Sequence, residues 1–217
     1  MKPLMDADEA LKKLASESVK QGEKLRQTVR ELTLKALQSR ELSLVQVKQV
    51  IKMVTEGINL GATTSKMDTG KLLSDALAGM DDALLKAAQA SHLALQQTTN
   101  AGQDFQDSYL KKALDDLEKW ESEWLKTVQQ AAKSADEKVK AQWASVLQQT
   151  PAGHTKTGAQ IAATMQEFGD RMHSTMRQQR EVGIKAAHML SQNFAALASG
   201  VLIGMSEGLQ SQSKKSQ

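Results

Sequence analysis

The stretch Phe194-Ala-Ala-Leu-Ala-Ser-Gly-Val-Leu-Ile-Gly-Met-Ser-Glu-Gly-Leu209 has glycine at every fourth position, at Gly200, Gly204 and Gly208. On a helix these glycines form one narrow stripe, which Ala196 extends by a step. Glycine costs roughly 1 kcal/mol relative to alanine inside a helix, so three of them require a compensating contact, such as a closely approaching second helix. The spacing predicts a helix-packing or surface-insertion stripe. Its larger flanking side chains are Phe194, Leu197, Val201 and Met205.

The surroundings of this stripe leave three interpretations open. Residues 186–206 carry no formal charge if His188 is neutral, and they form the most apolar window of the chain. The window fits a tight helix crossing in a bundle, a segment that packs on a lipid-like surface, or a membrane span. Its five polar residues Ser191, Gln192, Asn193, Ser199 and Ser206 argue against the span.

The composition predicts an all-α protein. The chain has 217 residues, two prolines and no cysteine, and alanine, leucine, lysine and glutamine dominate it. Few aromatic residues and many alanines favour thin seams between long helices. We expect an elongated antiparallel helical bundle with coiled-coil-like seams, about five helices and two of them very long. The net charge of +3 is spread over mixed faces, which argues against a nucleic-acid partner.

The periodicity sets the expected helices and their two-part organisation. An N-terminal part, residues 1–100, should hold about three helices, at 3–39, 44–61 and 70–98. Residues 101–217 should form a long helical hairpin of two helices, 104–149 and 157–209, broken at Thr150–Gly153, with a disordered tail at 211–217. Gly57 and Gly61 repeat the four-residue spacing, which predicts either a second close helix contact or a fraying helix end.

No pattern in the sequence predicts catalysis. The four histidines are scattered and are expected at the surface, and no phosphate-binding glycine loop or nucleophile motif is present. We therefore predict no catalytic, cofactor or metal site and no enzyme activity. Asp81 and Asp82 are adjacent and should point to different faces. Trp120, Trp124 and Trp143 fit either packing in a core or anchoring at a lipid interface.

Two segments of the C-terminal half carry a resemblance to a known family. The Lys/Gln/Ala/Ser-rich amphipathic stretch Gln129–Gln149 and the run Leu190–Leu209 are similar to phasins, the helical proteins that coat polyhydroxyalkanoate granules in bacteria. The first half, with Leu42–Gly57 and Leu77–Lys86, looks more like bacterial all-helical proteins of uncharacterised function.

The phasin resemblance implies a non-enzymatic coat or scaffold protein that adsorbs to a polyester granule or a lipid surface. It also implies association with a granule or membrane, whereas the helical seams predict self-association into a homo-oligomer and the N-terminal sequence predicts a cytoplasmic location. Without an apolar run near the N-terminus, no signal peptide is expected. Two alternatives stay open: a membrane-inserting or pore-forming protein that uses residues 186–209, and a soluble coiled-coil module that binds a protein partner.

Overall fold

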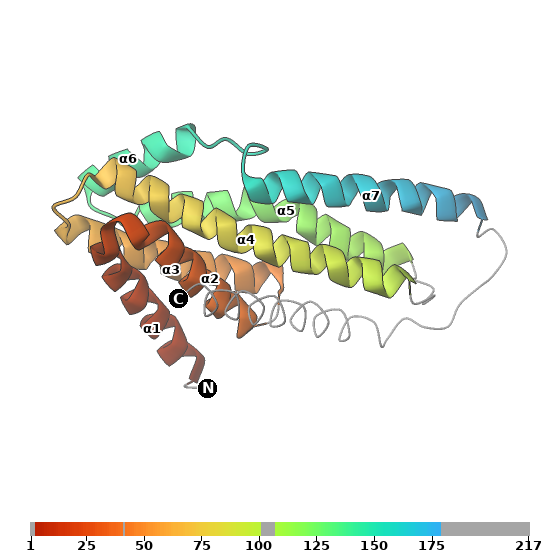
Figure 1. Ribbon diagram of the computed structural model, residues 1–217, viewed down its shortest axis with the longest axis horizontal. Coiled ribbons are helices and arrows are strands. Elements are labelled where there is room, and N and C mark those ends of the chain that lie inside the picture. Colours follow the sequence, from red (N-terminus) through yellow and green to blue (C-terminus); the bar gives the residue numbers. More distant parts are fainter. Residues whose placement is uncertain (1–2, 41, 101–106, 179–217) are drawn as a thin grey trace, which may run out of the picture.

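The computed structural model describes the backbone of residues 3–40, 42–100 and 107–178, and the side chains of 7–40, 42–97 and 112–168. Within these residues it is all-helical and elongated (Figure 1). The elements are α1 (Pro3–Ser18), the 3-10 helix η1 (Val19–Lys24), α2 (Leu25–Gln38), α3 (Leu44–Thr64), α4 (Thr69–Asn100), α5 (Asp107–Ala132), α6 (Glu137–Gln148) and α7 (Lys156–Gln178).

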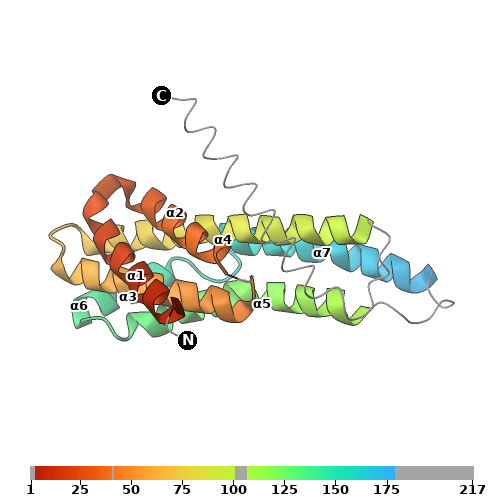
Figure 2. The same cartoon turned by 90° about the horizontal axis from the view of Figure 1, so that it is seen from below.

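The helices form three hairpins, and the middle one separates the other two. The first hairpin is α1, η1 and α2, the central hairpin is α3 and α4, and the third hairpin is α5 followed by α6 and α7 (Figures 1 and 2). α1 and α5 lie along α3, whereas α2, α6 and α7 lie along α4. The central hairpin is therefore covered on two sides by different parts of the chain.

Contacts along the helices give their directions. Lys48 of α3 binds Glu123 of α5, and further along Thr63 binds Asp136, so α3 and α5 run parallel. On the other side, Asp81 of α4 contacts Thr157 at the start of α7, and Gln96 contacts Glu167, so α4 and α7 are parallel as well. The third hairpin thus follows the path of the central one.

The first predicted helix, residues 3–39, is interrupted in the structure. It breaks at η1, where Gly22 has φ 58° and ψ −117°, a backbone conformation that other residues rarely adopt. The break lets α2 fold back from α1. The prediction of one continuous helix over 3–39 was therefore wrong at this turn. Leu14 of α1 is 52% exposed.

The predicted long helix 104–149 is also interrupted. α5 ends at Ala132, and α6 begins after Asp136, whose side chain accepts the Val139 N–H at 2.9 Å as an N-cap. The chain reverses here, at residues 133–136, rather than at Thr150–Gly153. The Thr150–Gly153 break does end a helix, but it joins α6 to α7, which both return along α4 (Figure 1).

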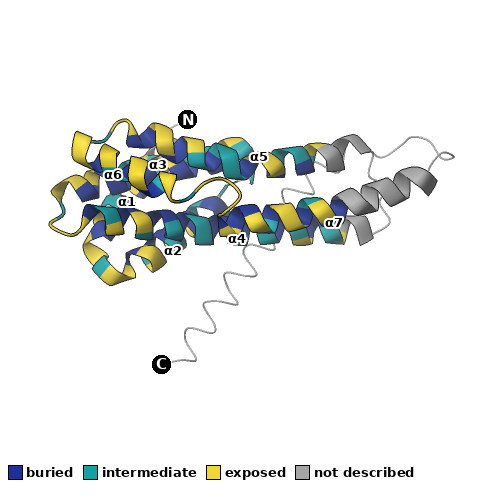
Figure 3. Cartoon of the chain, turned by 90° about the horizontal axis from the view of Figure 1, so that it is seen from above, coloured by how far each residue is buried: buried dark blue, intermediate teal, exposed yellow. Residues whose placement is uncertain are grey.

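One contiguous apolar core extends through all three hairpins, from Leu11 of α1 to Ile161 of α7. Alanines line much of α4, where Ala76, Ala83 and Ala87 are fully buried, which keeps the seams thin as the composition predicted. In Figure 3 buried residues alternate with exposed ones along the coloured parts of the helices. The boundary predicted at residue 100 falls between α4 and α5, and the core includes residues from both sides of it.

Candidate functional site

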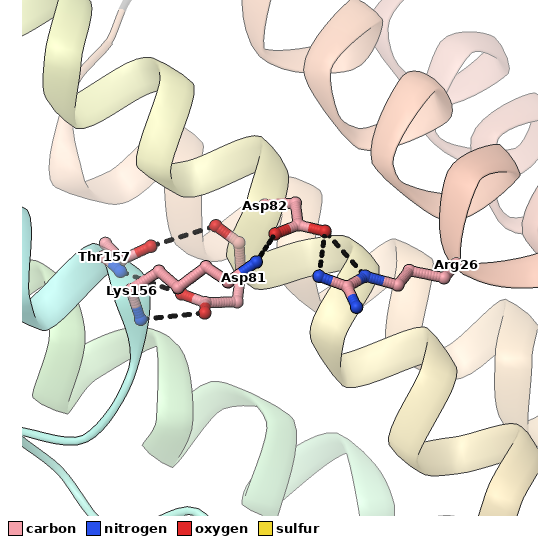
Figure 4. Close-up of polar contacts among 5 residues, drawn as sticks. All are labelled: Arg26, Asp81, Asp82, Lys156 and Thr157. Atoms are coloured by element: carbon pink, nitrogen blue, oxygen red, sulfur yellow. Dashed lines mark hydrogen bonds and ion pairs between the residues drawn. The ribbon is translucent and has the colours of Figure 1, made fainter.

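The start of α7 is held by a polar junction in which all three hairpins meet (Figure 4). The Asp81 carboxylate accepts the backbone N–H groups of Lys156 at 2.9 Å and Thr157 at 3.0 Å, and the Thr157 hydroxyl donates to the Asp81 carbonyl. A carboxylate at this position satisfies the free N–H groups at the positive end of a helix. The Asp81 carboxylate therefore fills the position at the N-terminus of α7 where an external anion would otherwise bind.

Asp82 links the first and third hairpins through the central one. Its carboxylate accepts hydrogen bonds from Arg26 of α2 and from Lys156, each at 2.7 Å. Burial alone would raise the pKa of Asp82, but hydrogen bonds from Lys156 and Arg26 and their charges lower it overall. The two adjacent aspartates, predicted to point to different faces, share Lys156 as a partner: Asp81 binds its backbone N–H and Asp82 binds its Nζ. Together they hold α7 and α2 to α4.

Glu121 of α5 fixes the segment that leads into α7. Its carboxylate accepts the Gly153 N–H at 2.9 Å and the Thr155 hydroxyl proton. Thr155 in turn caps α7 by accepting the Gly158 N–H at 2.8 Å. Glu121 lies between the buried apolar residues Leu117 and Trp124 of α5, and this contact accounts for a charged residue there.

Further along α7, His92 of α4 lies in a polar cluster rather than free at the surface. Its side chain is 18% exposed, and its Nε2 lies 3.4 Å from Glu167. The ring also contacts the Thr164 hydroxyl at 3.2 Å and the edge of Phe168. His92 is thus partly buried, contrary to the sequence expectation, whereas His154 is exposed. The cluster pairs α4 with α7 through polar groups.

The three tryptophans lie in the core, with exposures of 3% for Trp120 and 0% for Trp124 and Trp143. The Trp143 indole donates to the Asn59 side chain at 2.7 Å, and Asn59 donates to the Ala131 carbonyl at 3.0 Å. This buried network joins α3, α5 and α6. The tryptophans could anchor at a lipid interface only if the third hairpin separated from the central one.

Gly57 and Gly61 form a close contact between two helices. A Cβ atom added at Gly61 would lie 2.5 Å from both the Ser16 carbonyl oxygen and the Val19 side chain, and one at Gly57 would meet the Lys12 backbone. Both glycines are buried within α3. Of the two predictions for this pair, the structure therefore shows the close helix contact, with α1 as the partner.

The C-terminal stripe lies outside the described residues. This applies to its glycines and to Phe194, Ala196, Leu197, Val201 and Met205, so their predicted role stays a prediction. Among residues the structure describes, no group of three histidine, aspartate or glutamate side chains is placed to hold a metal ion. None of the described helices combines the length and apolarity needed to cross a membrane.

The contacts of Arg26, Asn59, Thr155 and Thr157 were not predicted from the sequence. Asn59 had a recognisable signal, because its amide stands between the apolar residues Ile58 and Leu60. The threonines at the start of α7 follow a proline–glycine break, where a capping residue is common. No local signal marks Arg26, because its partner Asp82 is distant in sequence and the fold alone brings them together.

Together these features define a helical-bundle protein whose described polar groups join helices to one another. A family model matches residues 1–211, and the chain belongs to that family, described as a family of unknown function (DUF6781). Comparison with curated proteins gave no match, and comparison with solved structures gave none. The family therefore agrees with the expectation of an uncharacterised helical family, and the phasin resemblance remains a hypothesis about function.

Proposed function

We propose that this protein is a non-enzymatic coat or scaffold protein that adsorbs to a polyester granule or lipid surface through amphipathic helices and self-associates there. One observation carries the proposal. The apolar side of α7 begins with Ile161 and Phe168, which are 5% and 0% exposed. In the sequence the same period continues through Leu190 and Leu197 to Met205, within the most apolar window of the chain.

The mechanism is reversible adsorption driven by apolar burial. Each Å² of apolar surface removed from water contributes about 25 cal/mol, so a helix that lays several large side chains on a surface binds it without a specific pocket. The close contact at Gly57 and Gly61 supports a packing role for Gly200 and Gly204, which have the same spacing. Helices with such stripes approach one another closely in a coat.

The test is flotation of the purified full chain with polyhydroxybutyrate granules and, in parallel, with anionic liposomes, each at low and high salt. Adsorption that survives high salt supports apolar burial, because salt screens charge attraction. The variant Leu197→Lys/Val201→Lys should lose adsorption, whereas the matched control Ser211→Lys/Gln212→Lys adds the same charge outside the stripe and should retain it. If the protein bound neither the granules nor the liposomes, the proposal would be contradicted.

A second variant pair tests self-association. Gly200→Leu/Gly204→Leu should reduce the oligomer size measured by analytical ultracentrifugation, because the added side chains prevent close approach of a second helix. Unchanged oligomer size and unchanged thermal stability would show that the stripe has no packing role.

A further inference from the structure

We propose that α7 is a detachable strap. It separates as one helix from α4 and α5, while α1–α4 stay folded. The inference rests on the proposed function, because a detached α7 presents its apolar side to a surface. It is carried by three features of the described residues: what α7 buries, how its first turn is held, and the segment that joins it to α6.

The buried side of α7 is rich in polar groups. Over 156–168 its buried side chains are Thr157, Ile161, Thr164 and Phe168, so only two are large and apolar. α3 differs, because it buries a continuous row of branched apolar side chains. They are Val47, Val50, Ile51, Val54 and Ile58. Since apolar burial is the main favourable contribution to folding, α7 is held less strongly than α3.

Hydrogen bonds and ion pairs hold the first turn of α7 in place of apolar contacts. Asp81, Asp82 and Glu121 bind the segment from Gly153 to Thr157, and the Lys156 side chain in the Asp82 pair is 55% exposed. Water replaces such partners when the helix leaves, so the net loss for each contact is small. This polar clasp, made by Asp81, Asp82 and Glu121, fixes α7 in position and still permits release.

The segment between α6 and α7 has room to act as a joint. Residues 151–154 are exposed, and a Cβ atom built on Gly153 would meet nothing within 4 Å. Gly153 has φ 88°, and glycine changes its backbone angles more freely than any other residue. Rotation there moves α7 without moving α6, which stays anchored by Trp143.

Release uncovers apolar groups on both partners. Leu95 of α4, Leu114 of α5 and Phe168 form a small cluster of their own, against which Met165 packs. When α7 detaches, Ile161, Met165 and Phe168 lie along one side of a free amphipathic helix. Such a helix adsorbs to an apolar surface, which connects the strap to the proposed coat function.

Hydrogen exchange of the full chain in solution tests the strap without any surface. Amides of residues 160–168 should exchange at least about tenfold faster than amides of residues 51–58, because α7 opens locally. Glu121→Ala and Asp81→Ala should each raise the α7 rates by about a further tenfold and leave the α3 rates unchanged. Glu137→Ala is the control, because within the described part of the chain Glu137 pairs only with Lys140 of its own helix. Equal rates in α3 and α7, or equal acceleration of both, would overturn the inference.

A cross-link then connects the strap to adsorption. The chain has no cysteine, so His92→Cys/Thr164→Cys introduces one reactive pair at a contact between α4 and α7. A short bis-maleimide should slow the exchange of α7 and abolish flotation with granules or liposomes, relative to the same variant without cross-linker. Equal flotation of both forms would contradict release as the route to adsorption. If the wild type does not float at all, the proposed function is wrong, whereas the exchange rates still test whether α7 detaches.

Discussion

The two sides of the central hairpin are packed in different ways. On the side of the first hairpin, glycines bring helix backbones together: Gly57 and Gly61 face α1, and a Cβ at Gly79 would lie 2.5 Å from the Arg26 carbonyl oxygen of α2. On the side of the third hairpin, contacts to the central hairpin run through long side chains, such as Glu123 to Lys48 and Trp143 to Asn59. Backbone contacts leave no group free to move, whereas side chains can adjust, so the two sides should respond differently to the same change.

The largest effect is expected where helix backbones touch. Gly57→Leu/Gly61→Leu should lower the free energy of unfolding by about 3 kcal/mol or more, since overpacking costs about 1–3 kcal/mol per site and the obstructing atoms include backbone. The better helix propensity of leucine, about 1 kcal/mol per site, offsets only part of this loss. Urea denaturation followed by circular dichroism measures the change.

A matched pair of alanine variants isolates the cause. In Gly61→Ala the new Cβ meets the Ser16 carbonyl, whereas in Gly158→Ala it meets only the end of the flexible Glu121 side chain. Gly158→Ala should therefore stay within about 1 kcal/mol of the wild type, and Gly61→Ala should lose more than that. Equal losses would show that an obstructing side chain within the third hairpin yields no more easily than an obstructing backbone on the first-hairpin side.

The next effect concerns the buried indoles on the third-hairpin side. Trp143 and Trp124 are both fully buried, but only the Trp143 Nε1 donates a hydrogen bond among the described residues, to Asn59. Trp143→Phe leaves the Asn59 oxygen without a donor, which costs about 1–3 kcal/mol beyond the loss of volume. We expect Trp143→Phe to be less stable than Trp124→Phe by about that amount in urea denaturation. The reverse order would exclude Asn59 as a structural anchor.

Acid should weaken the polar contacts between hairpins. Hydrogen bonds from Lys48 and Lys126 lower the pKa of Glu123 from 4.5 to about 2. At Asp8, burial opposes the shift, but hydrogen bonds from Arg40 and Gln49 and the charge of Arg40 lower its pKa. A lowered pKa in the folded state means that the stabilisation is complete above the unfolded value and is lost as the pH falls through the folded value.

Thermal unfolding at pH values between 6 and 2 measures this loss. The melting temperature should fall below about pH 4.5, and Glu123→Gln should make the fall smaller, because the glutamine does not titrate. Glu137→Gln removes an exposed carboxylate that pairs within α6 alone and serves as the control. An identical acid dependence in wild type and Glu123→Gln would mean that the Lys48 contact contributes nothing to the stability.

The sequence predicted the helices better than it predicted their connections. Helical periodicity marks α3 and α4 within a few residues, because each buries one continuous apolar row. It missed the breaks at Gly22 and at 133–136, since the apolar period continues through both and a single glycine or a short Lys-Ser-Ala-Asp run is a weak stop signal. The turn at 133–136 sets the direction of α6 and α7.

The polar junction illustrates a second limit of sequence reasoning. The partners of Asp81, Asp82 and Glu121 lie 32 to 76 residues away in the chain. Pairing at such distances depends on how hairpins stack, and no local pattern encodes it. The glycine pair Gly57/Gly61 was more informative, because a small-residue row at helical spacing has few uses other than close packing.

The smallest effect distinguishes the two glycines that have positive φ. Gly22 lies in the turn of the first hairpin with φ 58°, and Gly153 lies in the joint before α7 with φ 88°. Alanine is strained in such conformations by about 1–3 kcal/mol.

Because the first hairpin packs rigidly on the central one, Gly22→Ala should lower the free energy of unfolding of the whole protein by about 1 kcal/mol or more. Gly153→Ala lies in an exposed segment with free space around it, so its strain is relieved by a local shift that alters hydrogen exchange in α7 alone. If Gly153→Ala instead lowered the global stability as much as Gly22→Ala, the joint would be as rigid as the turn, and the contrast between the two sides of the central hairpin would not extend to their connections.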